Sequence, residues 1–99
     1  MKKNNILLIL LIFFSKIIHS NEIEITTIVE NCKGCHGYDL NGNEYISSIV
    51  KLKKEDFILK MKKYRQSNEN SVMIRIVKPL NSDDIQAIAN LIYKKYEKK

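Results

Sequence analysis

Residues 31–39 read NCKGCHGYD and contain both cysteines of the 99-residue chain, Cys32 and Cys35, followed directly by His36. Four interpretations compete for this spacing: a disulfide, a structural zinc site, a redox dithiol and a covalent haem attachment motif. A zinc site needs four ligands, and the only other histidine, His19, lies in a segment that we expect to be removed. A thioredoxin-like dithiol opens a helix in a βαβ unit, whereas this pair follows a helical pattern.

The haem interpretation accounts for all three side chains. Two thiols three residues apart can reach two vinyl groups of a porphyrin, and the adjacent imidazole is then held beneath the iron. Gly34 and Gly37 allow the backbone to approach the macrocycle closely. A disulfide would leave the histidine unexplained and would close a very short loop. We therefore expect one covalent haem c on Cys32 and Cys35, with its iron bound by His36. A haem-free thiol or metal-handling protein remains the alternative.

The first 20 residues have the pattern of a secretory signal peptide, with an early positive charge and an unbroken apolar run at 6–14. This run is shorter than the roughly 20 residues that cross a bilayer. We expect cleavage near Ser20, so that residues 21–99 form one domain in the periplasm that does not span the membrane.

The expected mature chain is only weakly basic. Residues 1–20 hold three lysines and no acid, so residues 21–99 carry 14 Lys and Arg against 11 Asp and Glu, a net charge of +3. These charges are scattered, which does not indicate a nucleic-acid interface. A solvated surface is the simpler interpretation. A docking face for an acidic protein partner is the alternative, formed by Lys51, Lys53, Lys54, Lys60 and Lys62.

Three main helices are predicted. The first begins near Thr27, where TIVE fits a capping box that ends at Glu30, and continues into CKGCH. Residues 38–50 contain an Asn-Gly-Asn turn signal and are expected to form a loop. The second helix covers residues 54–66, in which Phe57, Met61 and Tyr64 follow helical spacing.

The third helix has the strongest signals. Asn81 or Ser82 is its expected cap, and two aspartates follow in the first turn, where the helix dipole favours anions. Its apolar stripe consists of Ile85, Ile88, Ala89, Ile92 and Tyr96. The segment VMIRIV at 72–77 is short and is expected to be non-helical, because Pro79 stops it. The sequence therefore predicts an all-α fold with long loops.

These motifs together resemble the small bacterial monohaem class I cytochromes c over residues 26–97. The matching segments are CKGCHG (32–37), FILKMKKYR (57–65), VMIRIV (72–77) and LNSDDIQAIANLIY (80–93). The resemblance implies the class I cytochrome c fold around the haem. It also implies a one-electron Fe(II)/Fe(III) carrier rather than an enzyme.

A second axial ligand is part of the same resemblance, and it is commonly a methionine. Met73 lies shortly before the last helix, where the family places this ligand. Met61 falls in a helical stripe and is interpreted as core. An open iron, or one bound by lysine or water, is the remaining alternative.

The loop after CKGCH departs from the family pattern. Related cytochromes usually carry a proline there, whose carbonyl accepts a hydrogen bond from the proximal histidine. Residues 42–52 contain no proline. A carbonyl between Tyr45 and Ser48 is expected to replace it, because such bonds orient a metal-binding imidazole.

Two functions follow from these expectations. The first is a free periplasmic carrier that passes electrons between redox partner proteins. The second is the haem subunit of a larger periplasmic oxidoreductase, for example a sulfide-oxidising flavocytochrome, whose small c-type subunit is similar in the last two helices. The sequence does not set the reduction potential or the identity of the donor and acceptor.

Overall fold

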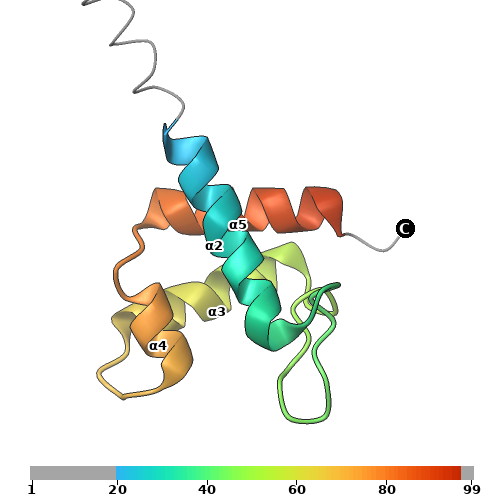
Figure 1. Ribbon diagram of the computed structural model, residues 1–99. Helices are drawn as coiled ribbons and strands as arrows, with labels where there is room; N and C mark the ends of the chain where they lie inside the picture. Colours follow the sequence, from blue (N-terminus) through green and yellow to red (C-terminus); the bar gives the residue numbers. More distant parts are fainter. Residues whose placement is uncertain (1–19, 97–99) are drawn as a thin grey trace, which may run out of the picture.

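The computed structural model describes the backbone of residues 20–96 and the side chains of residues 24–96. In this range the chain forms four helices and no strand (Figure 1): α2 (Ser20–His36), α3 (Lys54–Gln66), α4 (Val72–Val77) and α5 (Ser82–Lys95). The predicted all-α class is confirmed. Of the predicted signal peptide, only Ser20 lies within the described residues. No helix in the described part of the chain is long and apolar enough to cross a membrane.

Helix α5 forms the centre of the core, and it begins with a complete capping box. The Asn81 side chain accepts a hydrogen bond from the Asp84 amide at 2.8 Å, and the Asp84 carboxylate accepts one from the Asn81 amide at 3.0 Å. The predicted cap is therefore confirmed, and it is Asn81. The stripe differs at one place, because Tyr93 rather than Tyr96 is buried at its end. The buried residues of α5 are Ile85, Ile88, Ala89, Ile92 and Tyr93.

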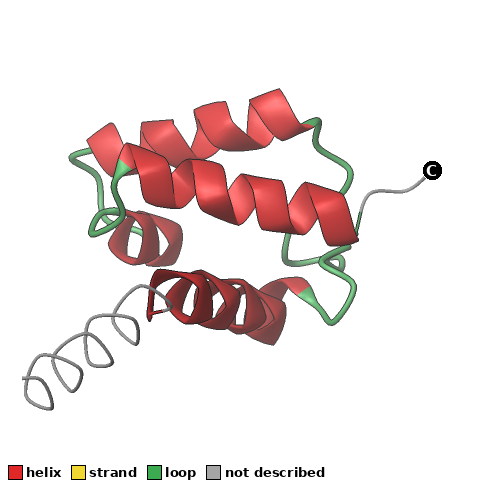
Figure 2. Cartoon of the chain, turned by 90° about the horizontal axis from the view of Figure 1, so that it is seen from above, coloured by secondary structure: helices red, strands yellow, loops and turns green. Residues whose placement is uncertain are grey.

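Helix α5 contacts both α2 and α3, and α4 contacts α3. Figure 1 shows α2 crossing in front of α5, and Figure 2 shows the helices from above with the loops at their ends. The bounds of α3 are those predicted, and its buried side chains are Phe57 and Met61. The Phe57 ring meets the Tyr93 ring with centroids 5.8 Å apart. This aromatic contact joins α3 to α5.

The predicted start of the first helix is wrong. Within the described residues α2 already covers Ser20 onward, so Thr27 and Glu30 lie inside it rather than at its cap. Around the local capping signal the helix carries an apolar stripe that starts at Ile25, upstream of Thr27. Its members follow the spacing i, i+3, i+4 and i+7 of one helix face and pack at the core; they are Ile25, Ile28, Val29 and Cys32.

The prediction that residues 72–77 are non-helical is also wrong, because they form α4. The Ser71 hydroxyl accepts a hydrogen bond from the Ile74 amide at 3.2 Å and caps the helix. Ile74 and Val77, three residues apart, are both buried and hold this short helix against the interior of the protein. Pro79 follows one residue after the C-cap, so it ends α4 rather than preventing it.

Candidate cofactor site

The C-terminal end of α2 places the sequence motif on one side of the helix. Cys32, Cys35 and His36 lie at i, i+3 and i+4, positions that share a helix face. The helix ends at His36, and Gly37 follows with a φ of 96°. Its amide donates to the Lys33 carbonyl at 3.1 Å, which closes the last turn. Glycine adopts this left-handed backbone without steric cost, so Gly37 turns the chain away directly after the motif.

A cavity of about 540 Å³ opens beside this helix end. Both cysteines and His36 line it, together with Met73 from α4 and Met61 from α3. Its volume lies within the roughly 300–1,000 Å³ of typical cofactor sites. The rest of the lining is mostly apolar and includes Ile28, Ile46, Ile49, Phe57, Val72, Ile76 and Leu80. The structure therefore brings the four residues predicted from the sequence to one apolar cavity.

The imidazole of His36 is oriented by the loop between α2 and α3. Its Nδ1 atom lies 2.8 Å from the Ser47 carbonyl oxygen. A carbonyl can only accept, so Nδ1 carries the hydrogen, and in the neutral ring the lone pair is on Nε2. The hydrogen bond expected from a carbonyl between Tyr45 and Ser48 is present, and the carbonyl, which the sequence did not identify, is that of Ser47. His36 thus keeps one nitrogen available as a ligand.

Gly42 makes this loop geometry possible, and the sequence indicated it only as part of a turn. Its amide donates to the His36 carbonyl at 2.7 Å, and its φ is 72°. A Cβ atom at this position would lie 2.3 Å from the Ile46 carbonyl oxygen and 2.8 Å from that of Ser47. No side chain fits between these two segments of the loop. Glycine therefore allows the Ser47 carbonyl to come within reach of the imidazole.

We expect Gly42→Ala to destabilise the protein by roughly 2–4 kcal/mol, because it adds both backbone strain and atomic overlap. Urea unfolding followed by circular dichroism measures the change. Gly34→Ala is the matched control, since a Cβ at Gly34 meets no atom within 4 Å and alanine favours the helix by about 1 kcal/mol. Equal destabilisation by the two variants would contradict this role of Gly42.

The two cysteines differ in their surroundings. Both are free thiols in this structure, so it contains no Cys32–Cys35 disulfide. The Cys32 thiol is half-buried and donates to the Ile28 carbonyl at 3.2 Å, and burial raises its pKa. Cys35 is exposed. The pair therefore presents one sulfur inside the cavity wall and one at its edge.

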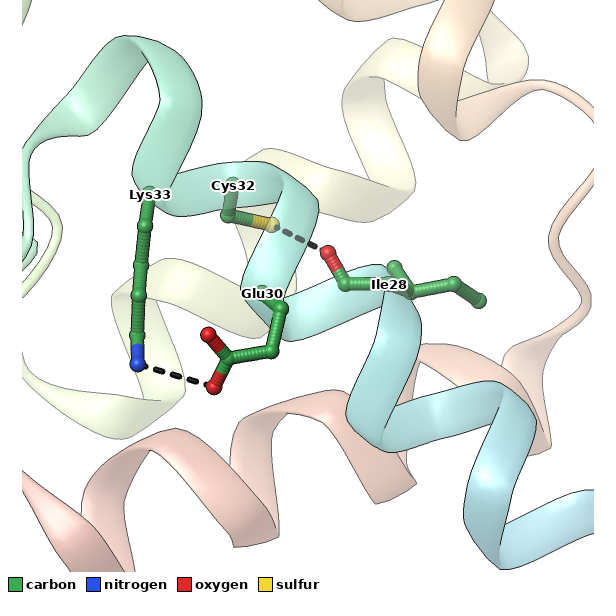
Figure 3. A network of polar contacts seen from close by, with 4 residues as sticks. All are labelled: Ile28, Glu30, Cys32 and Lys33. Carbon is green, nitrogen blue, oxygen red and sulfur yellow. Dashed lines mark hydrogen bonds and ion pairs between the residues drawn. The ribbon is translucent and has the colours of Figure 1, made fainter.

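Lys33, between the two cysteines, is not part of the cavity lining and fixes the helix end from outside (Figure 3). Its Nζ lies 2.8 Å from the Glu30 carboxylate and 5.2 Å from the centroids of both the Tyr38 and Tyr96 rings. The Glu30 carboxylate, followed by the Tyr96 hydroxyl, raises the pKa of Lys33 above its usual value. The charged amine therefore bridges α2, the following loop and the residue after α5.

Both methionines of the described residues reach the cavity. Met73 is half-buried on α4, whereas Met61 is buried on α3 and also belongs to the core cluster. The expectation that Met61 packs in the core is confirmed. Its place in the cavity lining is an addition that helical spacing alone did not indicate. The choice of Met73 as an iron ligand stays a prediction.

Among the described residues, no group of three or more His, Cys, Asp and Glu side chains is arranged to hold a bare metal ion. Comparison of the chain with protein-family models, curated proteins and solved structures found no match. The site must therefore be interpreted from its own residues.

Proposed function

We propose that this protein is an exported one-electron carrier with a single covalently attached haem c, of the small class I cytochrome c kind. The observation that supports it is the shared cavity. Cys32, Cys35 and His36 from α2 and Met73 from α4 line one apolar space of about 540 Å³, although 37 residues lie between Cys35 and Met73 in the sequence.

Each residue has a distinct role in this proposal. Cys32 and Cys35 would hold the porphyrin through thioethers, and Nε2 of His36 would bind the iron. The Ser47 carbonyl holds the ring in place through Nδ1, at 2.8 Å, and increases the basicity of the ligand. Met73 would contribute a thioether sulfur to the iron, and such a ligand favours the reduced state.

The haem supplies the Fe(II)/Fe(III) couple, and the polypeptide controls the surroundings of that couple. Phe57 and Ile49 are almost fully buried and line the cavity, so they exclude water from its inner wall. Exclusion of water makes the charged ferric state less favourable relative to the ferrous state. No side-chain arrangement for a further chemical step is needed, because electron transfer leaves both partners covalently unchanged.

The direct test is maturation of the full chain in a bacterial host that attaches haem to exported proteins. We expect haem to remain with the polypeptide after acid–acetone extraction, a pyridine haemochrome spectrum of the thioether type, and reversible one-electron oxidation. Mass spectrometry gives the stoichiometry, expected to be one haem per chain. A correctly processed, compact polypeptide with two unmodified thiols would disprove the proposal and favour the haem-free thiol alternative.

A second candidate function is the haem subunit of a larger oxidoreductase. Three apolar side chains at the cavity are unusually exposed, namely Tyr45 at 87%, Val72 at 58% and Ile76 at 47%. A partner subunit that covers the cavity would remove this apolar surface from water. Purification of the native protein distinguishes the two functions, since a subunit elutes in a stable heteromeric complex and a free carrier elutes as a monomer.

A further inference from the structure

The hydroxyl group of Tyr93 joins α5 to a distant part of the chain. It lies 3.1 Å from the Ile49 carbonyl oxygen and 2.9 Å from the Leu52 carbonyl oxygen. Tyr93 is only 8% exposed, and its ring packs against Phe57. Both acceptors belong to the loop between α2 and α3. One buried hydroxyl therefore fastens the end of this loop to the most buried helix of the protein.

The same loop carries the carbonyl that orients His36. Ser47 precedes Ile49 by two residues, and the Ile49 amide donates to the Leu40 carbonyl at 2.9 Å. Leu40 is fully buried and has a φ of 59°. The turn is therefore held by the burial of its side chain and by the hydrogen bond from Ile49. The contacts form a continuous path: from α5 through Tyr93 to Ile49, then through Ser47 to the imidazole.

We infer that Tyr93 is a positioning residue for His36, whose hydroxyl fixes the Ser47 carbonyl at hydrogen-bond distance from Nδ1. This inference rests on the proposed function in so far as His36 binds iron. The hydroxyl acts as a donor, and burial, followed by the charges of Asp56 and Glu55, raises its pKa and keeps it protonated. Its single hydrogen is shared between two carbonyls, so both acceptors depend on it.

Removal of this hydroxyl is expected to loosen the loop without unfolding the protein. Tyr93→Phe keeps the ring and its contact with Phe57. A second cavity of about 520 Å³ is lined by Val50, Leu52 and Tyr93 itself. Water in that cavity can solvate the Leu52 carbonyl when it loses its donor. The effect should therefore appear as more frequent local opening of the loop.

The experiment compares the wild type, Tyr93→Phe and a variant with 4-aminophenylalanine at position 93, which restores a donor at the same place. Hydrogen exchange of the His36 Nδ1 proton and of the Ile49 amide is followed by NMR in the reduced haem protein, which is diamagnetic. We expect exchange of both protons to be about five- to tenfold faster in Tyr93→Phe, the effect of one lost hydrogen bond. The amino variant should return to the wild-type rates.

A second readout is the reduction potential. A less well held Ser47 carbonyl reduces the basicity of the imidazole, so the ferric state is stabilised less and the potential of Tyr93→Phe rises. Tyr64→Phe is the control, because the Tyr64 hydroxyl makes no hydrogen bond with the described residues and Tyr64 does not line the cavity. It should leave both the potential and the exchange rates unchanged.

The outcomes separate this inference from the proposed function. Unchanged Nδ1 exchange, an unchanged potential, or a failure of the amino variant to restore the wild-type rates would each overturn the role of Tyr93, while the haem assignment stands. If the wild type carries no haem, the proposed function fails. The exchange comparison on the haem-free chain then decides by itself whether Tyr93 orients His36.

Discussion

Replacing Cys32 and Cys35 with serine together is expected to abolish covalent haem retention completely. The serine hydroxyl keeps the size of the side chain and, at position 32, a donor for the Ile28 carbonyl that the thiol contacts at 3.2 Å. It cannot form a thioether with a vinyl group. Acid–acetone extraction followed by the pyridine haemochrome assay measures the loss. The chain contains two cysteines, so no other thiol can substitute for them.

The same double variant is expected to lose much of its stability. A domain below about 80 residues obtains only about 3–5 kcal/mol from its core, and here a cavity of about 540 Å³ adjoins that core. Thermal unfolding should therefore shift strongly downward relative to the haem protein. The single variants are the matched controls, because each retains one thioether and is expected to keep some covalent haem. Full haem retention in the double variant would refute covalent attachment at these residues.

Replacing Met73 with alanine is expected to remove the sulfur-to-iron charge-transfer band of the oxidised protein and to lower the reduction potential. A thioether sulfur stabilises ferrous iron, and water or another oxygen ligand does so less. The decrease should be on the order of 0.1–0.3 V, within the ~0.8 V that axial ligands can span. Visible spectroscopy of the oxidised protein and potentiometric titration measure the two effects.

Met61→Ala is the comparison that decides between the two methionines of the cavity. Met61 is 6% exposed in the core on α3, so its removal is expected to cost roughly 2–5 kcal/mol of stability and to leave the band in place. Met73 is half-buried and contributes less to the core. Loss of the band in Met61→Ala and its persistence in Met73→Ala would assign the ligand to Met61 instead.

Local signals account for the helices that were predicted correctly. The capping box of α5 is contained within four residues, Asn81 to Asp84, and the apolar spacing of α3 repeats over two turns, from Phe57 to Tyr64. Helix α4 lacks such repetition, because its six residues span fewer than two turns and contain one buried pair at i and i+3. Burial of Ile74 and Val77 decides its conformation. Helix α2 likewise continues upstream of the capping signal at Thr27, where Ile25 packs against the core.

The loop between α2 and α3 illustrates a different limit. Its hydrogen bonds to His36 and Tyr93 join residues 11, 41 and 44 positions apart, and no periodic pattern relates such pairs. The missing proline indicated that some carbonyl must replace it. The tertiary structure identifies this carbonyl as that of Ser47. Gly42 allows the two segments of the loop to approach closely there, since a Cβ at Gly42 would lie 2.3 Å from the Ile46 carbonyl oxygen.

The amino-acid sequence by itself determined the helical class and the three neighbouring side chains Cys32, Cys35 and His36, because a helix turn places residues three and four apart together. The family resemblance added Met73, and tertiary structure alone decided which other distant groups face them. Met61 and the Ser47 carbonyl reach the cavity that Met73 also lines through the packing of α3 and one loop. Such contacts depend on chain reversals and on buried volume, which are properties of the whole fold.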